Sequence, residues 1–168
     1  MKVIFLDVDG VLNNYHTKEC CEGYTFISDD KVVLLKELIV QTGAKVVLSS
    51  TWRRGWECKE RVKEPTSSDL QDIRLFEALE AKLKEFGIAL LGYTEDFGRR
   101  GEEIDLWLKL WNGEPIESYV ILDDMGGVEM RPHARYLVQT GFWAGLSPKH
   151  VQKAIEMLNN AESEQEGD

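Results

Sequence analysis

The chain has little cysteine, few prolines and no long hydrophobic run. Its 168 residues include three cysteines, Cys20, Cys21 and Cys58. This odd set, with two members adjacent, does not form the disulfide framework typical of secreted proteins. No apolar run approaches the roughly 20 residues that a membrane helix needs, and the apolar run 3–6 is too short for a signal peptide. We therefore expect a cytoplasmic protein that does not contact membranes.

An excess of positive charge is also missing. The chain has 20 Lys and Arg residues against 30 Asp and Glu residues, giving a formal net charge of −10. Such a chain repels polyphosphates, so broad nucleic-acid binding is not expected. The set of His16 with the three cysteines matches no common zinc-ligand spacing, and free thiols are favoured over a zinc site.

The sequence shows no repeats and no linker that would divide domains. We expect one domain over residues 1–160, followed by an acidic, disordered tail at 161–168. Apolar runs predict buried strands at 3–6, 45–50, 88–91, 119–122 and, more weakly, 136–138. Helical spacing predicts helices over about 29–42, 69–86, 101–111 and 147–158. This alternation predicts an α/β fold, a three-layer α/β/α Rossmann-like arrangement around a parallel sheet of about five strands.

Polar residues directly follow three of these strands. They are Asp7-Val8-Asp9-Gly10, Ser49-Ser50-Thr51 and Asp123-Asp124. In parallel sheets the ligand lies beyond the carboxyl ends of the strands. Four converging carboxylates repel one another unless a cation joins them, and oxygen ligands of this kind select Mg²⁺. We therefore expect Asp7, Asp9, Asp123 and Asp124 to form a magnesium site; the alternative is a set of surface acids at strand ends.

Residues 5–12, Phe-Leu-Asp-Val-Asp-Gly-Val-Leu, resemble the first motif of the haloacid dehalogenase-like (HAD) phosphohydrolases. Residues 47–51 resemble the second motif, a strand that ends in Ser or Thr, and residues 120–124 resemble the fourth, a strand that ends in paired acids. The resemblance covers nearly the whole chain. The run 48–53 also looks like the branch of this superfamily found as domains in RNA-repair proteins.

The resemblance implies a chemical role for each motif residue. Asp7 would be the nucleophile that forms an aspartyl-phosphate, and Asp9 would be the general acid and base. Either Ser49 or Ser50 would bind the phosphoryl group, and Ser50 is favoured because it lies nearer the strand end. Asp123 and Asp124 would hold Mg²⁺.

The family's third motif is a Lys or Arg that neutralises the phosphate and the nucleophile. Arg100 is the favoured match and Arg99 the alternate, while the competing interpretation is that both are solvated loop arginines. Arg53 lies three residues after Ser50 and is a further candidate for phosphate contact.

Many members of the superfamily carry a large cap domain over the site, but this chain has room only for short inserts at 13–28 and 52–68. The resemblance therefore implies an open site with a minimal cap or none. Residues 52–63 contain five basic residues and two tryptophans, which could bind a nucleotide or a nucleic-acid end. Packing of these tryptophans on the sheet is favoured, and so is packing of Phe142 and Trp143.

The sequence thus favours a magnesium-dependent phosphohydrolase that acts on a phosphomonoester. The expected partner is a phosphorylated small molecule or the exposed end of a larger molecule, with a nucleic-acid end included. Two alternatives stay open. One is a phosphatase or phosphotransferase specific for nucleotides or nucleic-acid ends, and the other is a non-catalytic phosphate-binding module.

Overall fold

A computed structural model describes residues 1–160, and the tail prediction for 161–168 lies outside these residues. Five strands form one parallel sheet in the order β5-β4-β1-β6-β7. The strands are β1 (Lys2–Leu6), β4 (Lys45–Leu48), β5 (Leu90–Tyr93), β6 (Ser118–Asp123) and β7 (Leu137–Gln139). The central strand is β1, whose neighbours β4 and β6 bring their carboxyl ends to the same edge.

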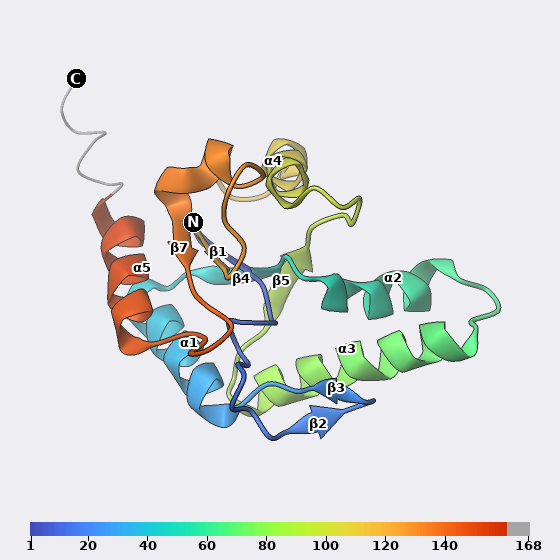
Figure 1. The fold of residues 1–168 in the computed structure, drawn as a ribbon. Coiled ribbons are helices and arrows are strands. Elements are labelled where there is room, and N and C mark those ends of the chain that lie inside the picture. The colour runs from blue at the N-terminus through green and yellow to red at the C-terminus, as the bar shows by residue number, and fades with distance from the viewer. Residues whose placement is uncertain (161–168) are drawn as a thin grey trace.

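Helices cover both faces of the sheet, which confirms the predicted three-layer fold (Figure 1). One face carries α1 (Asp29–Thr42), α3 (Ser67–Glu85) and α5 (Pro148–Asn160), and the other carries α4 (Arg100–Leu110) and the 3₁₀ helix η2 (Arg131–Tyr136). Alternate residues of β1 point to opposite faces. Ile4 and Leu6 join the core under α1, α3 and α5, whereas Val3 and Phe5 join the core under α4.

The segment that includes the insert at 52–68 begins with two helical elements. They are the 3₁₀ helix η1 (Thr51–Arg53) and α2 (Arg54–Arg61). With only eight residues, all of them charged or cysteine except Gly55 and Trp56, α2 is too short to be told from a loop by its pattern. The helix packs closely on α3 at Gly55, where an added Cβ would lie 2.1 Å from the carbonyl oxygen of Asp72. Figure 1 shows α2 beside the N-terminal part of α3, beyond the β5 edge of the sheet, while the rest of α3 runs back towards α1.

Two element boundaries also differ from those predicted. Helix α3 begins at Ser67 rather than Asp69, because Thr66 and Asp69 form a reciprocal capping box. Strand β5 lies two residues further along the chain than the apolar run 88–91 suggested. The side chain of Ile88 is buried in the core ahead of the strand, so an apolar run did not by itself mark the strand's start.

The insert at 13–28 contains a small antiparallel hairpin, β2 (Cys20–Cys21) and β3 (Tyr24–Thr25). Glu22 at its turn forms an ion pair with Arg74 of α3 at 2.8 Å, which fixes the hairpin against that helix. The three cysteines are free thiols, and within residues 1–160 the side chains grouped closely enough to hold a metal are aspartates, not His16 and the cysteines. No helix in the same range combines the length and apolar character needed to cross a membrane.

Candidate active site

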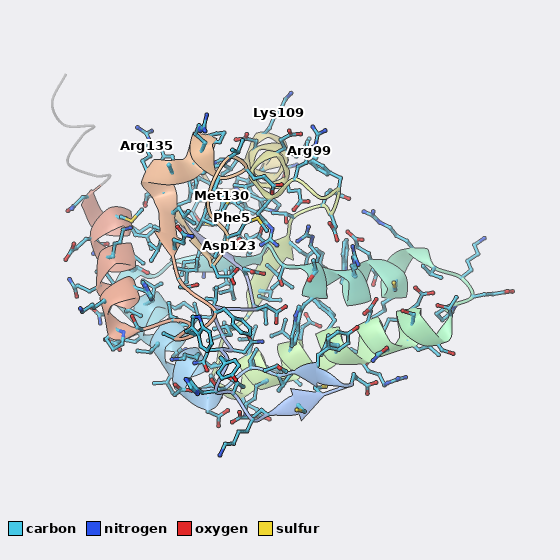
Figure 2. All side chains as sticks on the ribbon, in the orientation of Figure 1. Phe5, Arg99, Lys109, Asp123, Met130 and Arg135 are labelled. Atoms are coloured by element: carbon cyan, nitrogen blue, oxygen red, sulfur yellow. The ribbon has the colours of Figure 1, made fainter. Side chains whose placement is uncertain are left out.

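Three aspartates meet at the carboxyl edge of the sheet, in the middle of the molecule (Figure 2, Asp123). Asp7 follows β1 and Asp123 ends β6, and the pairing of Leu6 with Leu122 sets them beside each other. One carboxylate oxygen from each of Asp7, Asp123 and Asp124 lies within 4.8 Å of the others. The structure therefore brings together three of the four metal ligands expected from the strand ends.

Crowding and burial act on the protonation of these carboxyls. Burial raises the pKa of Asp7, and burial together with the charge of Asp7 raises the pKa of Asp123 to about 7. Burial and the nearby charge of Asp9 also raise the pKa of Asp124. The fold thus holds acids where their ionised forms are disfavoured unless positive charge is supplied. A set of carboxylate oxygens with an excess of negative charge is the kind of donor set that Mg²⁺ prefers.

Arg100 supplies one positive charge to the cluster. It is the first residue of α4 and is buried, with its Nη1 at 2.8 Å from Asp123 Oδ2 and 3.4 Å from Asp7 Oδ1. The same nitrogen donates to the carbonyl of Ser49. Arg99 is exposed and pairs with Glu102 at 3.1 Å (Figure 2). The structure therefore places Arg100, and not Arg99, at the carboxylates.

Asp9 is near the cluster but is not one of the three carboxylates grouped within 4.8 Å. Its Oδ2 accepts a hydrogen bond from the indole N–H of Trp52 at 2.9 Å, and its Oδ1 accepts one from the amide of Asn13 at 2.8 Å. Sequence reasoning did not assign Asn13 to the site and treated Trp52 as packing. Trp52 is indeed buried against Phe26, but its N–H also orients Asp9. No local signal could have shown this, because Trp52 and Asp9 are 43 residues apart.

Gly10 allows the loop after β1 to close over the cluster. Its φ is +70°, and an added Cβ would lie 2.4 Å from Asp124 Oδ2. A side chain would therefore meet both backbone strain and a steric clash. Its N–H donates to Asn13 Oδ1 at 2.9 Å, and its carbonyl accepts from Thr140 Oγ1 at 2.7 Å. The conformation of the Asp-Val-Asp-Gly loop therefore requires glycine at position 10.

The two serines after β4 have different surroundings, although both are buried. The Ser49 hydroxyl lies 3.4 Å from Thr94 Oγ1. The Ser50 hydroxyl lies beside the Asp7 carboxyl, where it counteracts the rise in the Asp7 pKa. Among residues 1–160, no group meets the distance and angle criteria for a hydrogen bond with this hydroxyl. Of the two serines, Ser50 therefore has the hydroxyl beside the cluster that is available to a ligand.

Arg53 lies in a second buried cluster next to α4. Its Nη2 is 2.7 Å from Glu103 Oε2 and 3.2 Å from Asp96 Oδ1. Oε1 of Glu103 accepts the backbone N–H groups of residues 97, 98 and 99 at 3.1, 2.9 and 3.1 Å. Arg53 thus helps to hold the start of the helix that carries Arg100. Its Nε and Nη1 have no partner within the described residues, and the phosphate contact stays a prediction.

The basic residues of α2 do not form an open cationic surface. Arg54 pairs with Asp96 at 3.1 Å, Lys59 with Glu77 at 2.8 Å and Arg61 with Glu95 at 3.0 Å. Trp56 packs on Tyr93 with ring centroids 3.8 Å apart. Residues 52–63 therefore have the arrangement in which the tryptophans pack against the protein, and not that of an open nucleotide-binding surface.

Comparison with known proteins gives one family match. A model of the family described as the HAD domain in Swiss Army Knife RNA repair proteins matches residues 3–151. Searches of curated proteins and of solved structures found no match. The matched range contains every site residue described above.

Proposed function

Because the chain belongs to the family of HAD domains in Swiss Army Knife RNA repair proteins, we propose that it hydrolyses phosphomonoesters with Asp7 as the nucleophile. The observation that carries this proposal is the meeting of three carboxylates with the guanidinium of Arg100 and the hydroxyl of Ser50. Asp7, Asp123 and Asp124 would hold Mg²⁺. When bound, Mg²⁺ offsets the charge of the carboxylates and of the substrate phosphate.

In the first step, a carboxylate oxygen of Asp7 attacks phosphorus, and the bond from phosphorus to the ester oxygen breaks. Asp9 gives its proton to the departing alcohol oxygen, which leaves an aspartyl-phosphate on Asp7. In the second step Asp9 takes a proton from water as the water oxygen attacks phosphorus. Inorganic phosphate leaves, and Asp7 and Asp9 return to their starting forms.

The neighbouring side chains support this chemistry by position and charge. The hydrogen bonds from Trp52 and Asn13 fix the direction of the Asp9 carboxyl. Arg100 offsets negative charge next to Asp7, and the Ser50 hydroxyl can donate to a phosphoryl oxygen. Preorganised donors of this type supply most of the catalysis in phosphoryl transfer.

The test is phosphate release from a generic aryl phosphate, with Mg²⁺ and with a chelator. We expect turnover that needs Mg²⁺ and that falls at least roughly a thousandfold in Asp7→Asn, which removes the nucleophile but keeps the shape. Asp105→Asn is the matched control, because this exposed aspartate of α4 faces His133 instead of the cluster. Undiminished turnover in Asp7→Asn would contradict the mechanism. Phosphate binding without turnover in the unaltered chain would favour the non-catalytic module.

A further inference from the structure

Three aromatic side chains from two loops form an exposed group that the proposed chemistry does not use. Tyr15, Phe142 and Trp143 are 59, 53 and 67 % exposed. Their rings contact one another, with centroids 4.6 Å apart for Tyr15 and Trp143 and 6.2 Å apart for Tyr15 and Phe142. We call these three residues the aromatic platform. Their exposure differs from the packing role expected of Phe142 and Trp143.

Two hydrogen bonds hold the two loops of the platform together. The backbone N–H of Tyr15 donates to the carbonyl of Phe142 at 2.8 Å, and the side-chain amide of Asn14 donates to the carbonyl of Ala144 at 3.1 Å. Gly145 has a φ of +62°, and an added Cβ would lie 3.0 Å from the carbonyl oxygens of Val11 and Asn13. The rings are therefore positioned before any ligand arrives, which lowers the entropic cost of binding.

The two loops that carry the platform start at the edge of the sheet where the carboxylates meet. They follow the carboxyl ends of β1 and β7. Asn13 contacts Asp9 directly, and Tyr15 is two residues further on, so the Cα atoms of Asn13 and Tyr15 are at most about 7.6 Å apart. On the other loop, Thr140 donates from its N–H to the carbonyl of Asp123 at 2.9 Å, two residues before Phe142.

We propose that the aromatic platform stacks a nucleobase of the substrate whose phosphate binds at Asp7, so that the substrate class is a nucleotide or the terminal nucleotide of a single strand. The position of the phosphate in this inference rests on the proposed function. Stacking on aromatic rings contributes roughly 1–3 kcal/mol per base and tolerates any base, because every base has a π face.

The charge distribution favours a contact with one nucleotide over a track along a nucleic-acid backbone. The net charge is −10, and the cations of α2 are paired with acids. Binding through one phosphate and one base releases few counterions, so the affinity should depend only weakly on salt. A protein that follows a phosphate backbone with basic side chains would show a steep dependence.

The experiment compares adenosine 5′-monophosphate with ribose 5-phosphate, which has the same phosphate and sugar but no base. Binding is measured by calorimetry with Mg²⁺ in the Asp9→Asn background, where turnover is slowed and the three grouped carboxylates remain. We expect the nucleotide to bind roughly tenfold more tightly than the sugar phosphate. Trp143→Ala should remove most of this preference and leave ribose 5-phosphate binding unchanged.

Two further variants separate stacking from general apolar contact and from loss of folding. Trp143→Phe keeps an aromatic face and should retain most of the preference, whereas Trp143→Leu should lose it. Leu110→Ala is the control, because Leu110 is 66 % exposed but lies at the end of α4 remote from Arg100. Trinucleotides phosphorylated at the 5′ or the 3′ end then distinguish a free nucleotide from a strand end as the preferred source of the base.

Equal affinity for the nucleotide and the sugar phosphate, or a preference that survives Trp143→Ala, would overturn the platform proposal. So would a dimer that Trp143→Ala dissociates while both ligands bind equally, since the rings would then serve contact between copies. A steep salt dependence with trinucleotides would also contradict it. A base preference in binding without phosphate release from the unaltered chain would instead refute the proposed function and leave the platform in place.

Discussion

Arg100 is the one cation in direct contact with two of the clustered carboxylates among the described residues. Replacing it with alanine should lower kcat/KM for a phosphomonoester roughly a hundredfold, because Asp7 and the phosphate would lose a preorganised positive charge. Arg99→Ala is the adjacent control, since its side chain is exposed and pairs with Glu102. Steady-state kinetics on both variants checks this. Equal losses in the two would mean that Arg100 acts only through general surface charge.

Ser49 and Ser50 offer a second comparison between neighbours. Ser50→Ala should lower kcat/KM roughly tenfold or more, because its hydroxyl faces Asp7, while Ser49→Ala should change it little. The free energy of unfolding of Ser50→Ala should not fall below that of the unaltered chain, since the lost hydroxyl has no full hydrogen bond within residues 1–160. Kinetics and urea unfolding measure the two effects. A larger kinetic loss in Ser49→Ala would reverse the assignment.

At this scale the sequence predicted the residues that directly follow strands. Asp7, Asp123 and Asp124 could be predicted as site residues because strand ends in a parallel sheet meet at one edge. Asn13 and Trp52 could not be predicted, because their contacts with Asp9 depend on how the loop and η1 fold. The choice between Arg99 and Arg100 likewise required the start of α4.

The start of α4 is the element that sets Arg100 in place. Glu103 holds the loop just before it by accepting the backbone N–H groups of residues 97, 98 and 99, and it pairs with the buried Arg53. Glu103→Gln should lower the free energy of unfolding by about 3 kcal/mol, because Arg53 would keep a buried charge without its closest partner. The matched control is Glu102→Gln, where the carboxylate is exposed. Urea unfolding gives the result, and an unchanged midpoint for Glu103→Gln would show that the pair is dispensable.

Among the elements, the long amphipathic helices and the fully apolar strands were predictable, since each carries its own periodicity. The hairpin β2–β3 and helix α2 were not. Each is short, and each is stabilised by contacts with α3, through Arg74 and Glu22 in one case and at Gly55 in the other. Both elements depend on contacts with α3, which follows them in the chain, and the local sequence does not show such contacts.

The whole molecule carries a large negative charge, part of which is concentrated at one sheet edge. Mg²⁺ should therefore raise the Tm, by roughly 5–10 °C at a hundredfold excess over Kd. The shift should shrink as the pH falls below about 7, because the raised pKa of Asp123 lets protons compete with the metal. Differential scanning calorimetry with and without a chelator measures it.

Two variants show whether this thermal shift comes from the cluster. Asp124→Asn should reduce the shift strongly, because it removes one of the three grouped ligands. Asp105→Asn changes the net charge by the same amount at an exposed position and should leave the shift intact. Equal shifts in both variants would indicate diffuse screening of the negative surface instead of a bound ion.

The central claim is that Asp7 carries the phosphoryl group between substrate and water. Rapid quenching during turnover with Mg²⁺, followed by borohydride reduction, converts an acyl-phosphate into homoserine, which peptide mass spectrometry locates. The account predicts homoserine at position 7, and none without Mg²⁺ or in Asp7→Asn. Phosphate release with Asp7 unmodified throughout turnover, or homoserine at Asp9 instead, would contradict it.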